Sequence, residues 1–297
     1  MKELFNPLVY IITINWNGID DTIECLDSLK GITYPNCKII VVDNGSKNNQ
    51  AEKIKEKFKN IELIKNKKNE GFVIANNQGV KLALKNGADY ILLLNNDTII
   101  KNDFLNILIE YAEKDNNVGI LSPKIIYYDS EIIWSMGGRI SYLTGISIMI
   151  GKTKKPEQYN KIIKPDFLTG CAMLIKRKVF DKIGLLDPIY FAYYEDVDFS
   201  FKARKAGYTI KVIPESIIWH KKSASAGIRG SIREINKLQA YLWARNGIIF
   251  GRKNISGWRK ISFLFGHLTF KFIFVLLNLT KKKYISCYVQ GLIHARK

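Results

Sequence analysis

The chain has 297 residues, of which 47% are hydrophobic and 12% aromatic, which suits one large domain or a domain with an appendage and argues against disorder. Its four cysteines show no paired spacing, so a disulfide framework and a zinc knuckle are not expected and a reducing compartment is favoured. The formal net charge is +19, and Ile235 to Lys297 contains no Asp or Glu. A basic tail of this kind favours an anionic partner, either a nucleic acid or an acidic membrane surface.

The first 123 residues alternate between expected strands and expected helices. Apolar runs predict strands at 7–15, 37–43, 61–66, 89–97 and 118–123, and amphipathic stretches predict helices at 20–31, 49–60, 72–87 and 101–115. In the first of these helices, Asp21 and Glu24 are spaced as in a capping box. Repeated β-α-β units predict an α/β fold with a mainly parallel sheet that is covered by helices on both faces.

The second part of the chain is less regular. Two or three short antiparallel strands are expected at 125–145, followed by a basic, mobile segment at 152–165. A strand and a helix are expected at 167–184, a short helix at 199–206, and a last strand at 208–220 that ends near His220.

Three of the expected strands end in short polar groups: Asn15–Asn17, Asp43–Asn44 and Asn95–Asp97. Ligands of open α/β sheets bind outside the carboxyl ends of the strands, although Asn and Asp also favour ordinary turns. Neither a P-loop nor a GxGxxG pattern follows any strand, which argues against a kinase-like ATPase and a simple dinucleotide dehydrogenase. Asp97 offers a hard oxygen to a divalent cation, which usually takes one or two carboxylates together with substrate phosphates.

The stretch FAYYEDVDFSFKARKAGY (Phe191–Tyr208) gathers three carboxylates, Glu195, Asp196 and Asp198, in a basic chain. One interpretation is structural, because Asp196 or Asp198 could cap a helix that ends before Gly207. The other is functional, with one carboxylate acting on a substrate. The pattern alone leaves both open.

Several motifs resemble those of family 2 glycosyltransferases, and most of all their rhamnosyltransferase-like branch: IITINWNG, VVDNGS, NEGFVIANNQG, LLLNND, FLTGCAMLIKRKVF and FAYYEDVDFSFKARKAG, in this order. The resemblance covers about Leu8 to Asn246. It implies a GT-A fold, with a nucleotide-binding half at 1–123, an acceptor-binding half at 124–230 and a basic, amphipathic helical region at 231–297. It also implies an inverting transferase that depends on Mg²⁺ or Mn²⁺.

The resemblance further implies roles for single residues. Asn15 and Asp43 correspond to contacts with the donor base and ribose, and the other residues expected on the donor side are Asn17, Asn69, Gly71, Asn76, Asn77, Asn95 and Asn96. Asp97 corresponds to the metal-binding aspartate of a DxD motif whose first position is Asn95 here.

His220 corresponds to a histidine that completes the metal site in some relatives, with a surface histidine as the alternative. Asp196 corresponds to the general base that takes the proton of the acceptor hydroxyl. Glu195 is expected to position the acceptor, and Asp198 to cap the helix.

The tail contains an expected helix at about Lys260–Leu279 whose longest unbroken apolar run, Phe272–Leu277, is too short to span a bilayer. At 100° per residue, Lys260, His267, Lys271 and Asn278 share one arc, which suggests a polar stripe on a wide apolar helix. Such a helix suits the interface of an anionic membrane. The alternative is a helix packed on the catalytic domain or on a second subunit.

The function predicted from these features is sugar transfer from a nucleotide-diphosphate sugar to a hydroxyl of a lipid-linked or cell-surface glycan, at the cytoplasmic face of the cell membrane. Deoxythymidine-diphosphate rhamnose is the first donor expected and UDP-sugars come second. Two other functions stay open: a nucleic-acid-binding protein that uses the basic tail, and a non-catalytic glycan-binding GT-A protein. A nucleic-acid-binding protein would require basic residues interleaved with exposed aromatics, whereas the aromatics here mostly lie in apolar runs. No nucleic-acid partner is therefore expected. A homodimer stays open.

Overall fold

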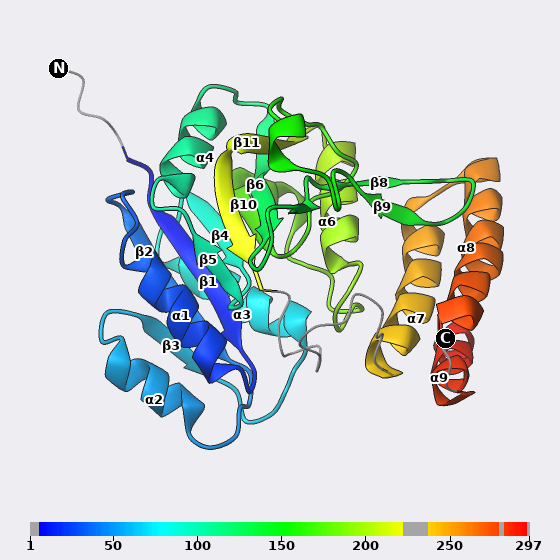
Figure 1. The fold of residues 1–297 in the computed structure, drawn as a ribbon, viewed down its shortest axis with the longest axis horizontal. Helices are drawn as coiled ribbons and strands as arrows, with labels where there is room; N and C mark the ends of the chain where they lie inside the picture. The colour runs from blue at the N-terminus through cyan, green and yellow to red at the C-terminus, as the bar shows by residue number, and fades with distance from the viewer. Residues whose placement is uncertain (1–5, 222–236, 279–281, 296–297) are drawn as a thin grey trace.

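The computed structural model describes residues 6–221, 237–278 and 282–295 (Figure 1). Its first half is a four-stranded parallel sheet in the order β3-β2-β1-β4. These strands are β1 (Val9–Asn15), β2 (Cys37–Asp43), β3 (Glu62–Lys65) and β4 (Tyr90–Leu94). The strands predicted from the apolar runs are therefore confirmed in this half.

Helices cover both faces of the sheet. One face packs on α1 (Ile19–Leu29), α2 (Gln50–Lys57) and α4 (Phe104–Glu113), and the other on α3 (Phe72–Lys85), α5 (Arg177–Ile183) and α6 (Glu195–Lys205). Alternate residues of β1 serve the two cores, since Tyr10 and Ile12 face the α3 side and Val9 and Ile11 face the α1 side. All four side chains are fully buried, as expected of a strand covered on both faces.

The second half extends the sheet in the order β4-β10-β6-β11-β5, with β7 also paired to β6. These strands are β5 (Thr98–Ile100), β6 (Val118–Tyr127), β7 (Ile133–Ser135), β10 (Ala172–Lys176) and β11 (Thr209–His220). β10 runs antiparallel to β4, with Ala172 opposite Leu94. The start of β10 therefore lies at the sheet edge where β4 ends.

Two strands differ from the prediction. The strand predicted at 118–123 continues past Pro123 to Tyr127, because its pairing with β11 resumes after a register shift at Ile213–Ile217. β5, which directly follows the Asn95–Asp97 group, was not predicted, because three residues are too few for a period to show.

The segment between β7 and β10 forms a second small sheet. β8 (Gly138–Ile140) pairs with β9 (Ser147–Met149), and their hairpin reaches toward the C-terminal helices (Figure 1). A short 3-10 helix, η1 (Pro156–Gln158), lies in the basic segment predicted to be mobile. That segment is tied to β11 by a pair of backbone hydrogen bonds between Ile163 and Val212.

The C-terminal region is helical, as predicted, and consists of α7 (Lys237–Asn254), α8 (Gly257–Asn278) and α9 (Lys282–His294), which stand together at one side of the sheet (Figure 1). Phe250 of α7 and Phe263 of α8 belong to the same core as α6. No helix within the described ranges is both long and apolar enough to cross a membrane. The predicted domain boundary at 230/231 lies outside the described residues.

Three local predictions are wrong. α1 is preceded by Gly18 without a side-chain cap, and Asp21 and Glu24 instead pair with Lys221. α6 begins at Glu195 rather than Phe199, so Asp198 lies inside the helix and caps nothing.

The predicted polar stripe of α8 is the third. His267 is fully buried: Gly247 leaves room for its ring, which a Cβ there would approach to 2.0 Å, and Gly145 lets the backbone of α8 come close at His267. The side chains of Lys271 and Asn278, also assigned to that stripe, lie outside the described set. The arc assigned to solvent is thus turned toward the body at His267.

Candidate active site

Two predicted metal ligands meet at the carboxyl edge of the sheet. Asp97 follows β4, and His220 is the last residue of β11, which pairs with β5 so that His220 is opposite Thr98. This pairing brings Nε2 of His220 to 3.1 Å from Oδ1 of Asp97, and both side chains are buried. The backbone oxygen of Asp97 also accepts a hydrogen bond from the backbone N–H of Lys221. Asp97 and His220 therefore lie together, and their binding of a metal stays a prediction.

The surroundings of His220 favour its protonated form in the free protein. Burial by itself would lower the pKa of His220, but Cys171 and Asp97 outweigh it and raise this pKa well above the usual range. Burial raises the pKa of the Cys171 thiol, and the neighbouring His220 opposes this shift. The ring of His220 packs edge-on against Trp134, with the ring centroids 4.5 Å apart. A divalent cation would take the place of the proton between His220 and Asp97.

The acidic cluster lies at the same edge. Gly170 directly precedes Cys171, and its N–H donates to Oδ2 of Asp196 at 2.9 Å. The N–H of Val197 donates to Oδ1 of Asp196 at 2.8 Å, so each carboxylate oxygen keeps a lone pair for another partner. Burial raises the pKa of Asp196 although both N–H groups oppose the shift. Asp196 is partly exposed and is thus oriented, accessible and more basic than an ordinary aspartate.

The two neighbouring carboxylates have different environments. Glu195 is buried, and its Oε2 atom has no hydrogen-bond partner among the described residues. Burial, and then the charge of Asp196, raise the pKa of Glu195 well above its usual value. Asp198 is 1% exposed, pairs with Lys202 at 2.7 Å and accepts a hydrogen bond from Asn254 of α7 at 2.6 Å. Asp198 therefore links α6 to α7.

A turn of unusual backbone conformation presents the acidic cluster. Tyr193 and Tyr194 both have positive φ, at 65° and 74°, a region that non-glycine residues avoid. Nδ2 of Asn246, on α7, donates to the carbonyl oxygens of Ala192 and Tyr193 at 2.8 Å each. Asn246 is fully buried. Asn246, the last residue that the family resemblance covers, thus lies directly behind this turn.

Arg245 supports the same clamp. Its Nη1 atom donates to the Oδ1 atom of Asn246 and to the carbonyl oxygen of Ile189, both at 2.9 Å. α7 thus holds the loop before α6 at three carbonyl groups.

The predicted donor side is organised around buried amides. Nδ2 of Asn15 lies 2.7 Å from Oδ2 of Asp43 and also within hydrogen-bond distance of Ser46 and Gln50. Oδ1 of Asn15 accepts the hydroxyl of Thr22. Asn15 is fully buried, so within the described chain it orients Asp43, which is 2% exposed. Contact of either residue with a donor stays a prediction.

A second amide network was missed. Asn44 is buried, donates to Asn69 Oδ1 at 2.9 Å, and accepts hydrogen bonds from Asn66 and from the N–H of Glu70. Asn69 Oδ1 also accepts the N–H of Gly71. The signal was the position of Asn44 directly after Asp43 at a strand end, which is equally common in simple turns.

Gly71 joins the donor side to the acidic loop. Its φ is 89°, and a Cβ at this position would lie 2.5 Å from the ring of Phe191. Only glycine meets both conditions, because other residues would be strained in conformation and would collide with the ring. The first turn of α3 is thereby pressed against the loop that leads to Asp196.

Other predicted donor residues are engaged within the fold. Asn76 is buried and donates to the carbonyl of Phe72, Asn96 donates to Thr22, and Asn17 accepts the N–H of Lys47. Asn95 is partly exposed beside Asp97. For these four residues, contact with a donor stays a prediction.

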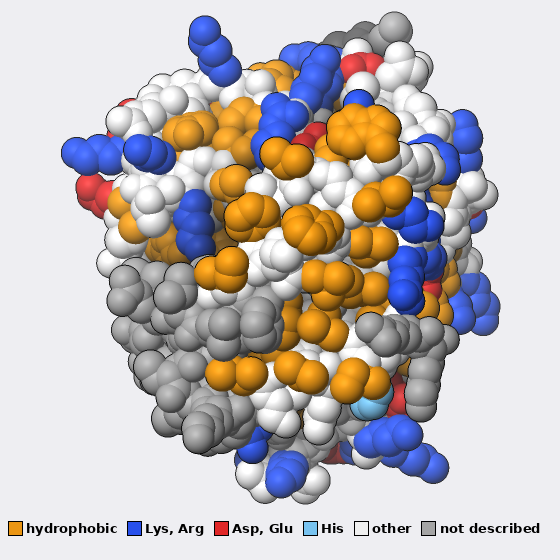
Figure 2. Space-filling model, turned by 90° about the vertical axis from the view of Figure 1, so that its right-hand side faces the viewer, with side chains coloured by type: hydrophobic (Ala, Val, Ile, Leu, Met, Phe, Trp, Pro, Cys, Tyr) orange, Lys and Arg blue, Asp and Glu red, His pale blue; other side chains and the backbone are white. Residues whose placement is uncertain are grey.

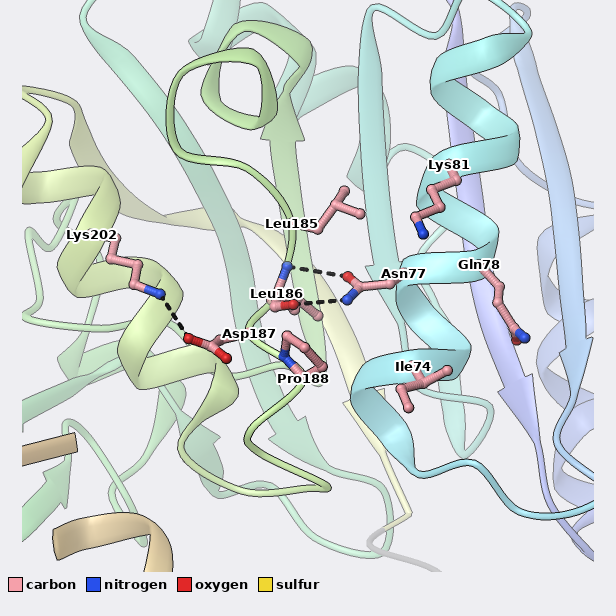
Figure 3. Close-up of a pocket in the computed structure, with 9 residues that line it drawn as sticks. All are labelled: Ile74, Asn77, Gln78, Lys81, Leu185, Leu186, Asp187, Pro188 and Lys202. Carbon is pink, nitrogen blue, oxygen red and sulfur yellow. Dashed lines mark hydrogen bonds and ion pairs between the residues drawn. The ribbon is translucent and has the colours of Figure 1, made fainter. Parts of the chain in front are cut away.

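Asn77 is also engaged within the fold. Its amide binds both the N–H and the carbonyl of Leu186, at 3.1 and 2.8 Å (Figure 3). It lines a groove of about 540 Å³ on the outside of α3, whose lining includes neither Asp97 nor Asp196. The side-chain amide of Asn77 is used by the fold, and its contact with a donor stays a prediction.

Comparison with known proteins assigns the family. The family described as "Glycosyl transferase family 2" matches residues 10–184, which is more than half of the chain. The chain belongs to this family.

Two of the curated relatives of this family 2 glycosyltransferase are rhamnosyltransferases. It is 23% identical over 253 residues to the dTDP-rhamnosyl transferase RfbF of Shigella flexneri, covering 84% of this chain and 81% of the relative. It is 24% identical over 221 residues to the N-acetylglucosaminyl-diphospho-decaprenol L-rhamnosyltransferase of Mycobacterium tuberculosis, covering 68% and 72%. A poly-beta-1,6-N-acetyl-D-glucosamine synthase of Staphylococcus aureus is 30% identical over 205 residues, and the match covers 67% of this chain but only 46% of that protein.

Solved structures show the same fold. The S. aureus TarS 1-349 complex with UDP-GlcNAc gives a TM-score of 0.63 at 16% identity, over 97% of this chain and 80% of that one. The mannosyltransferase PcManGT of Pyrobaculum calidifontis, in complex with GDP-Man and Mn²⁺, gives 0.60 at 15% identity, over 99% and 87%. The predicted GT-A fold is confirmed, as is the recognition of a rhamnosyltransferase-like family 2 chain.

The residues at the sheet edge fit a divalent cation. Two neighbouring ligands of an octahedral ion, each at about 2.1 Å, lie roughly 3 Å apart, and Asp97 Oδ1 and His220 Nε2 are 3.1 Å apart. Throughout the described ranges no three His, Cys, Asp or Glu side chains form a metal cluster. Mg²⁺ at diphosphates usually takes one or two carboxylates together with substrate phosphates and water.

Proposed function

We propose that this glycosyltransferase moves rhamnose from a deoxythymidine-diphosphate donor to a hydroxyl of a lipid-linked glycan, with inversion at the sugar carbon. Both rhamnosyltransferases compared above cover at least two thirds of this chain, and one of them is named for dTDP-rhamnose. The name of the other contains a diphospho-decaprenol, which supports a lipid-linked acceptor. The single observation that carries the reaction type is the placement of Asp196 at Gly170, which lies two residues before β10 begins and next to Cys171, the neighbour of His220.

In this proposal the donor binds against β1 to β4, with its diphosphate at Asp97 and its nucleoside toward Asp43. Asp97 and His220 would hold Mg²⁺ or Mn²⁺, which neutralises the negative charge that grows on the departing nucleoside diphosphate. Asn15 keeps the Asp43 carboxylate oriented through the 2.7 Å hydrogen bond. The buried amide network thereby pre-organises the donor site, so that less order has to be imposed on binding.

The acceptor binds on the other side of the sugar, against the segment that follows β6. Its hydroxyl oxygen attacks the sugar carbon while the bond from that carbon to the diphosphate breaks, and Asp196 Oδ takes the hydroxyl proton. The raised pKa of Asp196 strengthens it as a base, and the N–H groups of Gly170 and Val197 hold its position. Burial raises the pKa of Glu195 and so favours its protonated form, which can donate a hydrogen bond to the acceptor.

A donor panel tests this proposal. We expect dTDP-rhamnose with Mn²⁺ to raise the Tm of the full chain more than UDP-GlcNAc or GDP-mannose does, since a ligand bound only by the folded state adds stability. Transfer to a polyprenyl-diphosphate glycan is then followed with the donor that gives the largest shift. A larger shift and faster transfer with a UDP-sugar would refute rhamnose while leaving the reaction type intact.

A further inference from the structure

α8 is apolar on two opposite faces. Its inner face packs on α7 through Phe263 and His267, which are 1% and 0% exposed. Its outer face carries four large apolar side chains that are 43–73% exposed: Trp258, Ile261, Phe265 and Leu268. Their spacing of three and four residues keeps them on one side of the helix. A contiguous exposed apolar face of this kind marks an interaction surface, so the outer face calls for an occupant.

The tip of the β8–β9 hairpin extends this surface. Leu143 is 71% exposed, and its carbonyl oxygen accepts a hydrogen bond from the Ser262 hydroxyl. Gly266 permits this close approach, because a Cβ there would lie 2.4 Å from the same oxygen. We call Leu143, Trp258, Ile261, Phe265 and Leu268 the docking face. Figure 2 shows the gathering of exposed apolar side chains on this side of the molecule, with Lys and Arg around it.

Charge decides between two occupants. The chain from Ile235 to Lys297 has no Asp or Glu, whereas it has Arg259 and Lys260 within α8 and Lys281–Lys283 just after it. In a symmetric dimer the same surface would meet itself and bring these positive charges together without acidic partners from this region. The headgroups of an anionic bilayer supply the missing negative charge.

The aromatic residues support the same occupant. Trp258 is 71% exposed, and the guanidinium of Arg259 lies over its ring, 5.8 Å from the centroid. Trp beside a basic side chain is typical of the boundary between the acyl chains and the headgroups.

We propose that the docking face lies on the surface of an anionic bilayer, with α8 parallel to the membrane plane. Trp258, Ile261, Phe265, Leu268 and Leu143 enter the boundary of the acyl chains, and basic residues meet the headgroups. As in the sequence prediction, the apolar side opposite His267 enters the membrane; the difference is that His267 is buried against the body of the protein. α8 packs on α7, and α7 carries Asn246 behind the turn before Asp196. The docking itself does not depend on the donor or the acceptor.

Vesicle sedimentation of the full chain tests the proposal. We expect binding to phosphatidylcholine vesicles that contain phosphatidylglycerol, and weaker binding to phosphatidylcholine alone. The double variant Ile261→Ser/Phe265→Ser removes two large apolar side chains from the docking face and should reduce partitioning at least about tenfold. Ile162→Ser, at an apolar residue that is 42% exposed outside this face, is the matched control and should bind like wild type.

A charge variant and the oligomeric state complete the test. Arg259→Glu/Lys260→Glu should abolish the preference for anionic vesicles, since basic residues at such a surface contribute about 1 kcal/mol each, or roughly fivefold. Circular dichroism should show unchanged helix content in every variant. Equal binding of the Ile261→Ser/Phe265→Ser variant and wild type would overturn the proposal. So would a wild-type dimer in light scattering that the same variant converts to monomers, because the occupant would then be a second copy.

Discussion

Asn246→Ala should reduce turnover through the turn before Asp196 without touching the donor site. The substitution leaves the carbonyls of Ala192 and Tyr193 without the Asn246 amide, which now lies 2.8 Å from each. Leaving a buried carbonyl unpaired costs about 1–3 kcal/mol, and these two are only half-buried, so together they cost roughly 2–4 kcal/mol. Holding Tyr193 and Tyr194 at positive φ costs about 1–2 kcal/mol each.

The free energy lost with the two hydrogen bonds is comparable to the strain energy of Tyr193 and Tyr194, which these bonds help to hold at positive φ. We therefore expect the turn to relax, although Tyr194 keeps its packing against Phe250, with the ring centroids 5.8 Å apart. The carboxylate of Asp196, two residues on, would lose its alignment with the acceptor. A misplacement of about 1 Å can cost roughly 10²-fold in rate.

The assay combines stability with kinetics. A destabilisation of roughly 2–4 kcal/mol should lower the Tm by about 5–15 °C. With saturating donor, kcat should fall up to about 10²-fold, whereas the donor concentration at half-saturation should stay unchanged, because Asp97, His220 and Asp43 are not touched.

Arg177→Ala is the matched control. Nη1 of Arg177 also donates to two carbonyls, those of Leu84 and Ala88, but beyond the end of β10 at the opposite edge of the sheet. It should lower the Tm and leave kcat as in wild type. The reasoning is refuted if Asn246→Ala also keeps the wild-type kcat at a temperature where both variants are folded.

Three further predictions concern the site. Asp97→Asn should keep the fold but abolish the Mn²⁺-dependent rise of Tm with donor, and an undiminished rise would show that Asp97 is not a metal ligand. Gly71→Ala should lower the Tm and weaken donor binding together, because a Cβ would lie 2.5 Å from the Phe191 ring at a φ of 89°; normal donor titration by calorimetry would argue against this coupling. Glu195→Gln should raise the Tm at neutral pH. The pKa of Glu195 is higher in the folded protein than in the unfolded chain, so wild-type stability is full below the unfolded pKa of 4.5 and declines as the pH rises toward the folded pKa. The difference in Tm between Glu195→Gln and wild type should therefore disappear in acid.

The polar groups at the carboxyl edge of the sheet could be predicted, because the end of a strand is visible in a short stretch of sequence. Each polar group follows a continuous apolar run, and the parallel order brings the ends of β1, β2 and β4 to one edge without further information. The meeting of Asp97 and His220 depends on the pairing of β11 with β5, a three-residue strand that no period reveals. Their proximity came from the family resemblance rather than from the pattern.

Side-chain partners could not be predicted in the same way. Asp21 and Glu24 have the spacing of a capping box, yet Lys221 reaches them from the end of β11, about two hundred residues further along the chain. His267 is buried because Gly247 makes room for its ring and Gly145 lets the backbone of α8 come close, which periodicity cannot show. Since α8 is apolar on both sides, its pattern does not say which side faces the body.

Asp196→Asn is the most direct test of the proposed reaction. The change preserves shape and removes the proton acceptor, so the single-turnover rate at saturating donor and acceptor should fall by about 10²–10⁴-fold. Donor affinity should stay unchanged, and Glu195→Gln, which imitates a protonated acid, should keep most of the rate. A near-normal rate for Asp196→Asn together with a large loss for Glu195→Gln would contradict the assignment of the base, and normal rates for both would contradict base catalysis by this cluster.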